Sequence, residues 1–215
     1  MVRVWKLIKP PFTKYAVKEM RVPDKEYFDI ALNEFKLIDD FNHPNIMKVY
    51  DIFYNELKEK IFTVMEYAGE GYDLNNFIKE SKNKVREEEQ VIITEDKIKS
   101  IMKMLLNGLQ YLHDEKRVCH RDIKPSNLYV TKDLKSLKIL DFNVALRISH
   151  DSKMFGVTGE ELYSAPELTL GKMYDEKVDM WSAGIVLYSL LTRGKKIRLD
   201  LDKREALDNA DNKSL

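Results

Sequence analysis

The chain has 215 residues, of which 44% are apolar, and this size and composition favour a folded globular protein over a disordered one. Its 36 basic and 36 acidic residues cancel, which gives no reason to expect binding to nucleic acid or to a membrane surface. The single cysteine, Cys119, excludes an internal disulfide and fits a cytoplasmic or otherwise intracellular compartment. No apolar run reaches the ~18 residues of a membrane span, and no signal peptide is recognisable.

The first 40 residues are predicted to form two strands and a helix. An approximate apolar pattern predicts a strand over residues 2–8, and Tyr15–Lys18 predicts a short second strand after a double proline. Asp24 is a candidate cap for the helix that follows. The apolar residues of this helix recur at spacings of three and four, as in an amphipathic helix: Phe28, Ala31, Phe35 and Ile38.

The next segment of the chain is predicted to hold two strands and, after a change of composition that follows Glu66, a loop and a short helix. Two apolar segments, Ile46–Phe53 and Ile61–Tyr67, predict a pair of strands, and two glycines then bracket a loop over residues 69–71. Residues 73–79 predict a short helix. The charged run over residues 81–90 is typical of a solvated surface insertion.

The C-terminal half is predicted to be mainly helical. Thr94 is a candidate cap for a long helix with one apolar face, formed by Ile98, Met102, Leu105, Leu109 and Leu112. Short strands are predicted at Leu128–Val130 and Leu137–Leu140, and the apolar segment Val178–Leu191 predicts a buried helix. Because strands dominate the first part and helices the second, the sequence predicts an α+β fold.

Three short segments in the C-terminal half carry residues suited to chemistry. They are His120-Arg121-Asp122-Ile123-Lys124-Pro125-Ser126-Asn127, Asp141-Phe142-Asn143 and Ala165-Pro166-Glu167. Their order and spacing resemble the protein kinase family, over about Val4 to Gly194. The resemblance implies a serine/threonine protein kinase with a two-lobed fold over residues 1–194. The small lobe would span about 1–66, the hinge about 66–71 and the large lobe about 72–194, followed by a polar tail over 195–215.

The resemblance also implies which residues of the small lobe and hinge bind ATP. Lys18 matches the strand lysine that holds the α- and β-phosphates, and Glu34 matches the helix glutamate that pairs with that lysine. The position of Glu34 at the edge of the apolar stripe supports such a pair, because a buried carboxylate needs a cation. Met65 fits the gatekeeper position, the backbone of Glu66 and Ala68 would bind adenine, and Asp73 would reach the ribose.

In the large lobe the resemblance implies the residues of phosphoryl transfer. Asp122 would accept or orient the proton of the substrate hydroxyl, and Lys124 would neutralise charge on the γ-phosphoryl group. Asn127 and Asp141 would hold Mg²⁺, which prefers oxygen ligands. Asp179 would hydrogen-bond the backbone of the catalytic loop, a structural role.

The activation segment would run from Asp141 to Glu167. It contains three candidate phosphorylation sites, Ser149, Ser152 and Thr158. Arg121, next to the catalytic aspartate, would be placed to receive such a phosphate through charge-assisted hydrogen bonds.

The sequence departs from the family pattern in several places. No glycine precedes Gly69, so the glycine-rich phosphate loop is missing, and the late helices of the large lobe are not recognisable. We therefore expect a kinase domain shortened at both ends. Asn143 replaces the glycine after Phe142, which predicts a stiffer backbone there. Glu160 replaces a threonine and would raise the pKa of Asp122 if buried beside it, or else point to solvent.

Other interpretations of these residues stay open at this point. Lys18 and Glu34 also fit an ordinary ion pair, and Asp122 with Asn127 also fits a turn stabilised by local caps. His120 fits a packed core histidine. The alternative function is a non-catalytic pseudokinase or kinase fragment that binds a nucleotide or a protein.

Overall fold

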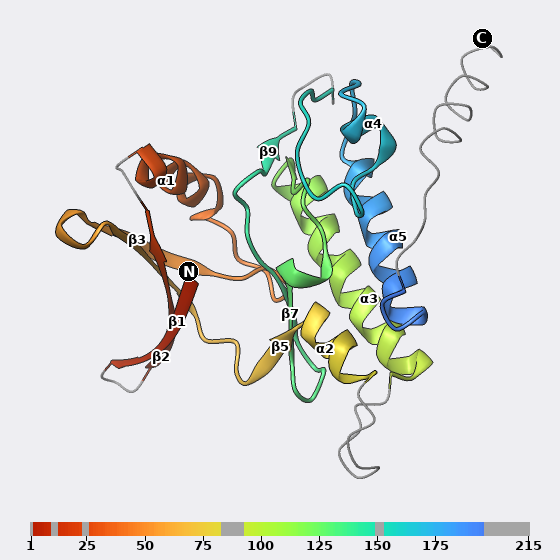
Figure 1. The fold of residues 1–215 in the computed structure, drawn as a ribbon, viewed down its shortest axis with the longest axis horizontal. Coiled ribbons are helices and arrows are strands. Elements are labelled where there is room, and N and C mark those ends of the chain that lie inside the picture. Colours follow the sequence, from red (N-terminus) through yellow and green to blue (C-terminus); the bar gives the residue numbers. More distant parts are fainter. Residues whose placement is uncertain (1, 10–12, 23–25, 83–92, 149–152, 196–215) are drawn as a thin grey trace.

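The computed structural model describes residues 2–9, 13–22, 26–82, 93–148 and 153–195. An antiparallel sheet and one helix form the N-terminal part, and a mainly helical C-terminal part lies beside them (Figure 1). The predicted α+β fold is confirmed. In the described part of the chain, no helix combines the length and the apolar character needed to cross a membrane.

The N-terminal sheet has four antiparallel strands in the order β1-β2-β4-β3. Their bounds are β1 Val2–Lys9, β2 Thr13–Arg21, β3 Val49–Asn55 and β4 Lys60–Glu66. In β2 and β4, Ala16 pairs with Met65 and Lys18 pairs with Thr63. Because directly opposed residues and residues two apart share a face, these four side chains lie on the same side of the sheet.

Helix α1, Glu26–Ile38, packs against β3. The Phe28 ring of this helix stacks on the Tyr54 ring of β3, with the ring centroids 5.4 Å apart. Ile38 is buried at the other end of the helix. The helix predicted from Phe28, Ala31, Phe35 and Ile38 is therefore present, while its candidate cap Asp24 lies outside the described residues.

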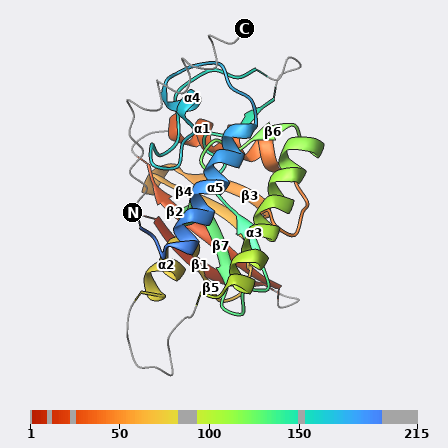
Figure 2. The same ribbon diagram turned by 90° about the vertical axis from the view of Figure 1, so that its right-hand side faces the viewer.

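The C-terminal part holds most of the helices. Its longer helices are α2 Leu74–Glu80, α3 Glu95–Gln110 and α5 Lys177–Leu191, and α4 Pro166–Thr169 is a single turn. Its short strands are β5 Gly71–Asp73, β6 Val118–Cys119, β7 Leu128–Thr131, β8 Leu137–Ile139 and β9 Leu146–Arg147. Short helical turns occur at Glu56–Lys58, Tyr111–Glu115 and Pro125–Asn127. Helices α3 and α5 pack side by side (Figure 2).

Helix α3 begins as predicted. The Thr94 hydroxyl accepts a hydrogen bond from the Lys97 N–H. The negative charges of Glu95 and Asp96 in the first turn interact favourably with the positive end of the helix dipole. The buried face contains Ile98, Ile101, Leu105 and Leu109. Met102, which was expected on this face, is only half-buried, because Ile101 takes the core position.

The strand predicted from Ile46 begins three residues later, at Val49. Ile46 instead forms an isolated parallel bridge with Ile139 of β8. The Met47 N–H donates to the Ile139 carbonyl at 3.0 Å, and the Ile139 N–H donates to the Asn45 carbonyl at 2.8 Å. This segment therefore joins the N-terminal part to the C-terminal part instead of extending β3.

Helix α5 is buried along most of its length, as the apolar segment predicts. Val178, Val186 and Leu190 are almost completely buried. Met180, Trp181 and Leu191 of the same helix are exposed. The run Lys196–Leu215 and most of the charged run over residues 81–90 lie outside the described residues.

Candidate functional site

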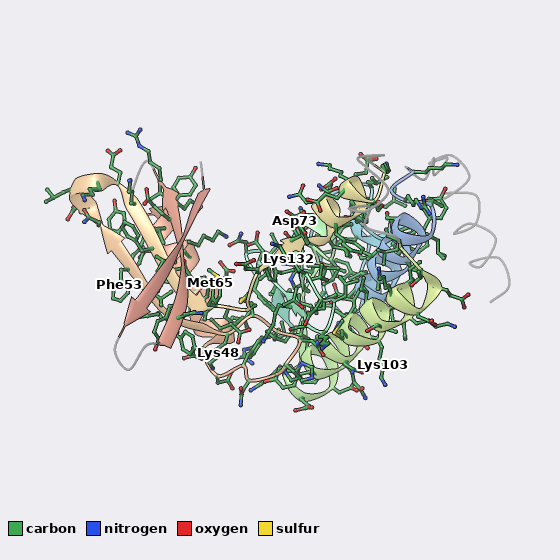
Figure 3. The ribbon with its side chains drawn as sticks, turned by 90° about the horizontal axis from the view of Figure 1, so that it is seen from below. Lys48, Phe53, Met65, Asp73, Lys103 and Lys132 are labelled. Carbon is green, nitrogen blue, oxygen red and sulfur yellow. The ribbon has the colours of Figure 1, made fainter. Side chains whose placement is uncertain are left out.

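A cavity of about 270 Å³ lies where the sheet, α1 and the C-terminal part meet. Lys18 and Met65 line it from β2 and β4, Glu34 lines it from α1, and Asn127 and Asp141 line it from the C-terminal part. Figure 3 shows Met65 at this junction, between the strands and the helical part. The cavity thus brings predicted site residues from both halves of the chain together.

The loop after β6 holds the predicted catalytic residues. The Asn127 side-chain nitrogen donates to the carbonyl and to Oδ2 of Asp122, each at 2.9 Å. The Lys124 ammonium lies 2.9 Å from the same Oδ2. Although partial burial opposes it, the hydrogen bond from Lys124 to Asp122 and the nearby Glu160 carboxylate raise the pKa of Lys124. Lys124 is therefore held as a cation beside the Asp122 carboxylate.

His120 has a structural position in this loop. Its side chain is fully buried, and Nε2 lies 3.0 Å from the Leu140 carbonyl, to which it donates. Nδ1 then accepts a hydrogen bond from the Asp122 N–H at 3.3 Å. The imidazole therefore orients the backbone of Asp122, as expected for a packed core histidine.

Asp179, in the first turn of α5, holds the same loop through hydrogen bonds to its backbone. The carboxylate is completely buried, and it accepts the backbone N–H groups of His120 and Arg121, each at 2.8 Å. Burial favours the neutral acid, but hydrogen bonds from His113 and His120 outweigh it and hold the pKa of Asp179 below its usual value. The hydrogen bonds predicted between Asp179 and the backbone of the loop that carries Asp122 are therefore present.

His113, Cys119 and Asp179 are close enough together to be considered as metal ligands. Burial raises the pKa of the Cys119 thiol well above its ordinary range, so the thiolate that a metal needs is disfavoured. The Cys119 Sγ and the His113 Nε2 both lie within hydrogen-bonding distance of Asp179 Oδ2. This cluster is therefore a hydrogen-bonded structural centre.

Glu34 and Lys18 face the same cavity, but the expected ion pair is not formed. Among the described residues, Lys18 has no ion pair, and the Glu34 carboxylate accepts the Phe142 N–H at 2.8 Å. Burial raises the pKa of Glu34, and the Asp141 carboxylate adds to this, while the Phe142 N–H and Lys18 act in the opposite direction. Glu34 thus connects α1 to the segment around Phe142 rather than to β2.

The segment Asp141-Phe142-Asn143 takes a conformation that differs from the expected one. The left-handed backbone is at Asp141, with φ of 66°, and not at Asn143. Asn143 therefore carries no left-handed strain, which corrects the expectation of a stiffer backbone. Its side-chain amide instead donates a short hydrogen bond to Asp141 Oδ1. The Phe142 ring is buried against His120, with centroids 4.8 Å apart.

The residues predicted to bind adenine and ribose lie outside the lining of this cavity. The Glu66 N–H donates to the Lys48 carbonyl at 2.9 Å, and its carboxylate forms an ion pair with Lys138. Ala68 is half-buried in the connection between β4 and β5. The Asp73 carboxylate caps α2, where it accepts the Asn76 N–H at 2.8 Å, and Figure 3 shows it on the helical side of the junction. This capping bond competes with any contact from Asp73 to a ribose.

Arg121 is already hydrogen-bonded to the protein. Its Nε donates to the Val144 carbonyl and its Nη1 donates to the Tyr174 hydroxyl, both at 2.7 Å. The Tyr174 hydroxyl in turn donates to the Gly156 carbonyl at 3.2 Å. Tyr174 therefore connects the catalytic loop to the activation segment. Sequence reasoning did not identify Tyr174, because it lies in the connection between α4 and α5 and belongs to none of the motifs.

The candidate phosphorylation sites are only partly within the described chain. Ser149 and Ser152 lie outside the described residues. Thr158 is half-buried, and its carbonyl accepts a 3.5 Å hydrogen bond from the Ser164 hydroxyl. Arg121 uses its Nε and Nη1 in hydrogen bonds to Val144 and Tyr174, so a phosphate on this segment would meet a guanidinium that is already held in place by the protein.

Residues 3–213 match the protein kinase domain family. The chain belongs to the protein kinase family. The serine/threonine-protein kinase atg1 of Dictyostelium discoideum is 36% identical over 186 residues, which are 84% of this chain and 26% of that protein. The serine/threonine-protein kinase ULK3 of Xenopus laevis is 32% identical over 169 residues, or 78% of this chain and 33% of that protein.

A solved structure supports the same family. A chain in the crystal structure of the yeast RNA Pol II CTD kinase CTDK-1 complex matches with a TM-score of 0.74 and 28% identity. The match covers 92% of this chain and 60% of that one. This kinase chain spans only 26% and 33% of the length of the two curated relatives described above.

Proposed function

We propose that this kinase domain transfers the γ-phosphoryl group of ATP to a serine or threonine hydroxyl of a protein substrate. The observation that carries the proposal is the arrangement of Asp122, Lys124 and Asn127 around one carboxylate oxygen. The Asn127 amide and the Lys124 ammonium fix the orientation of the Asp122 carboxylate, which leaves Oδ1 to accept the proton of a substrate hydroxyl. The Lys124 cation then stands where negative charge develops on the transferred group.

Asn127 and Asp141 fit a magnesium site. The Asn127 side-chain nitrogen is committed to Asp122, so its carbonyl oxygen remains for a cation. Asp141 contributes a carboxylate to the same cavity, and its neighbour Leu140 donates its N–H to the Asn127 backbone carbonyl at 2.9 Å. A hard cation such as Mg²⁺ takes oxygen ligands of this kind together with phosphate oxygens. When bound, Mg²⁺ would neutralise charge on the phosphates of ATP.

Lys18 supports the proposed nucleotide site as the cation of the cavity wall on the β2 side. Its ammonium is not used in an ion pair with another described residue, so it remains available to phosphate oxygens. Glu66 and Ala68 stay the proposed adenine contacts through their backbone, while Glu34 lines the same cavity and accepts the Phe142 N–H.

A phosphotransfer assay with ATP, Mg²⁺ and a mixture of serine and threonine peptides tests the proposal. Replacing Asp122 with Asn removes the proton acceptor, and we expect a loss of activity of about 10²-fold or more. Asp133→Asn is a matched control, because this carboxylate lies in an exposed turn. Equal activity of the wild-type chain and Asp122→Asn would refute the proposal.

A second candidate is a non-catalytic module that binds a nucleotide. The observation that favours it is the position of the Glu160 carboxylate, 3.6 Å from the Lys124 ammonium. Glu160 therefore competes with the transferred phosphoryl group for the positive charge of Lys124. Thermal shift with Mg²⁺ and ATP separates the two candidates. A nucleotide-dependent shift that is lost in Asp141→Asn, with no phosphotransfer by the wild-type chain, would favour the module.

A further inference from the structure

Glu160 is held in a fixed place by its own backbone. Its carbonyl accepts the Tyr163 N–H at 2.9 Å, the Ser164 N–H at 3.0 Å and the Ser164 hydroxyl at 2.9 Å. Three hydrogen bonds to one carbonyl restrain the chain on its C-terminal side. The start of the Glu160 side chain is therefore well positioned, although its carboxylate reaches solvent.

The preceding residue brings this backbone against the catalytic loop. Gly159 has φ of 83°, and a Cβ atom built on it would lie 2.7 Å from the Arg121 carbonyl oxygen and 3.7 Å from Asp122 Oδ1. Only glycine permits both this conformation and this approach. The close contact places Glu160 directly beside the loop that carries Asp122.

The side chain completes a group of three charges. The Lys124 ammonium lies 2.9 Å from Asp122 Oδ2 and 3.6 Å from Glu160 Oε2. One cation therefore faces two carboxylates, which leaves the group with an excess of negative charge. Glu160 has 53% of its side chain exposed and Asp122 has 17%, so this excess negative charge faces solvent mainly at Glu160.

We propose that Glu160 is a specificity-determining residue that selects substrates with lysine or arginine next to the phosphorylated serine or threonine. This inference rests on the proposed function, in which the acceptor hydroxyl approaches Asp122. The Cα atoms of neighbouring peptide residues are about 3.8 Å apart. A long lysine or arginine side chain next to the acceptor residue can therefore extend from the peptide backbone near Asp122 to the Glu160 carboxylate. An acidic neighbour would instead meet an unbalanced carboxylate.

From the resemblance to the protein kinase family we expect threonine, which carries no charge, at the position of Glu160. The substitution therefore adds a negative charge to the acceptor side of the site without changing Asp122, Lys124 or Asn127.

Peptide binding measured by fluorescence anisotropy tests this inference without requiring turnover. The full 215-residue chain is titrated with three labelled peptides that carry alanine in place of the acceptor and differ only in its two neighbours, Arg, Ala or Glu. The variants are Glu160→Gln, which removes the charge but keeps the shape, and Glu161→Gln, which removes the adjacent exposed charge. Parallel phosphotransfer assays use the same peptides with serine restored.

We expect the wild-type chain to bind the Arg peptide about five- to tenfold more tightly than the Glu peptide. Glu160→Gln should reduce this ratio to less than about twofold, and Glu161→Gln should leave it unchanged. A wild-type chain without this preference, an unchanged ratio in Glu160→Gln, or equal effects of the two variants would overturn the inference. The expected binding ratios without phosphotransfer would support the inference and refute the proposed activity.

Discussion

Replacing Asp179 with Asn tests the idea that one buried carboxylate holds the catalytic loop. The side chain of Asp179 is completely buried at the start of α5. Oδ1 accepts the Arg121 N–H at 2.8 Å. Oδ2 accepts the His120 N–H at 2.8 Å, and the side chains of His113 and Cys119 also contact it. An asparagine keeps the shape but offers one oxygen and one NH₂ group.

The cost follows from these contacts. If the asparagine oxygen takes the place of Oδ2, its nitrogen faces the Arg121 N–H, and two donors meet in a buried place. An unsatisfied buried donor costs about 1–3 kcal/mol, and hydrogen bonds to a charged acceptor exceed neutral ones by roughly 1 kcal/mol each. We expect Asp179→Asn to lower the free energy of unfolding by about 3–5 kcal/mol, a large share of the 5–15 kcal/mol of a typical domain.

Urea unfolding at pH 7 measures this loss. Asp114→Asn is the control, because Asp114 is an exposed carboxylate in the same region and should change stability by less than about 0.5 kcal/mol. Because the pKa of Asp179 is lowered, its contribution is present above the unfolded pKa near 3.9 and is lost as the pH falls through the folded pKa. A loss below about 1 kcal/mol at pH 7 would refute the reasoning.

Two further substitutions test contacts around the cavity. Burial raises the pKa of Glu34, so the stability that its protonated form contributes is lost as the pH rises through the folded pKa. The melting temperature of Glu34→Gln should therefore rise relative to that of the wild type as the pH goes from 4 to 8. A constant difference in melting temperature across that range would contradict this. Tyr174→Phe removes the hydroxyl that joins Arg121 to Gly156 and should lower the free energy of unfolding by about 1–2 kcal/mol in urea. Tyr54→Phe is its control, and an equal loss in both variants would rule out a specific role for the Tyr174 hydroxyl.

Local sequence patterns predicted the elements well where one interaction dominates. The Thr94 cap and the apolar face of α3 are encoded within a few residues, and both are present. The start of β3 was predicted three residues too early. The reason is that Ile46 and its neighbours pair with Ile139, a contact across 93 positions that no local pattern contains.

The site was predicted less completely, because hydrogen-bond partners depend on tertiary structure. The spacing of Asp122, Lys124 and Asn127 placed them on one loop, and the structure brings them together. The sequence did not indicate that Glu34 would accept the Phe142 N–H in place of an ion pair with Lys18. Whether Glu34 binds the Phe142 N–H or Lys18 depends on how α1 is placed against the segment after β8. That placement results from tertiary packing, which no local pattern contains.

A continuous series of contacts connects the buried end of α5 to the proposed specificity residue. Asp179 holds the Arg121 N–H, and the side chain of Arg121 reaches Tyr174, whose hydroxyl contacts Gly156 of the activation segment. Three residues further on, Gly159 packs against the Arg121 carbonyl and carries the chain into Glu160. The same arginine is therefore fixed at its N–H, its side chain and its carbonyl. Because these contacts share one residue, a shift of the loop in Asp179→Asn should move Glu160 as well as Asp122, and peptide preference should weaken together with stability.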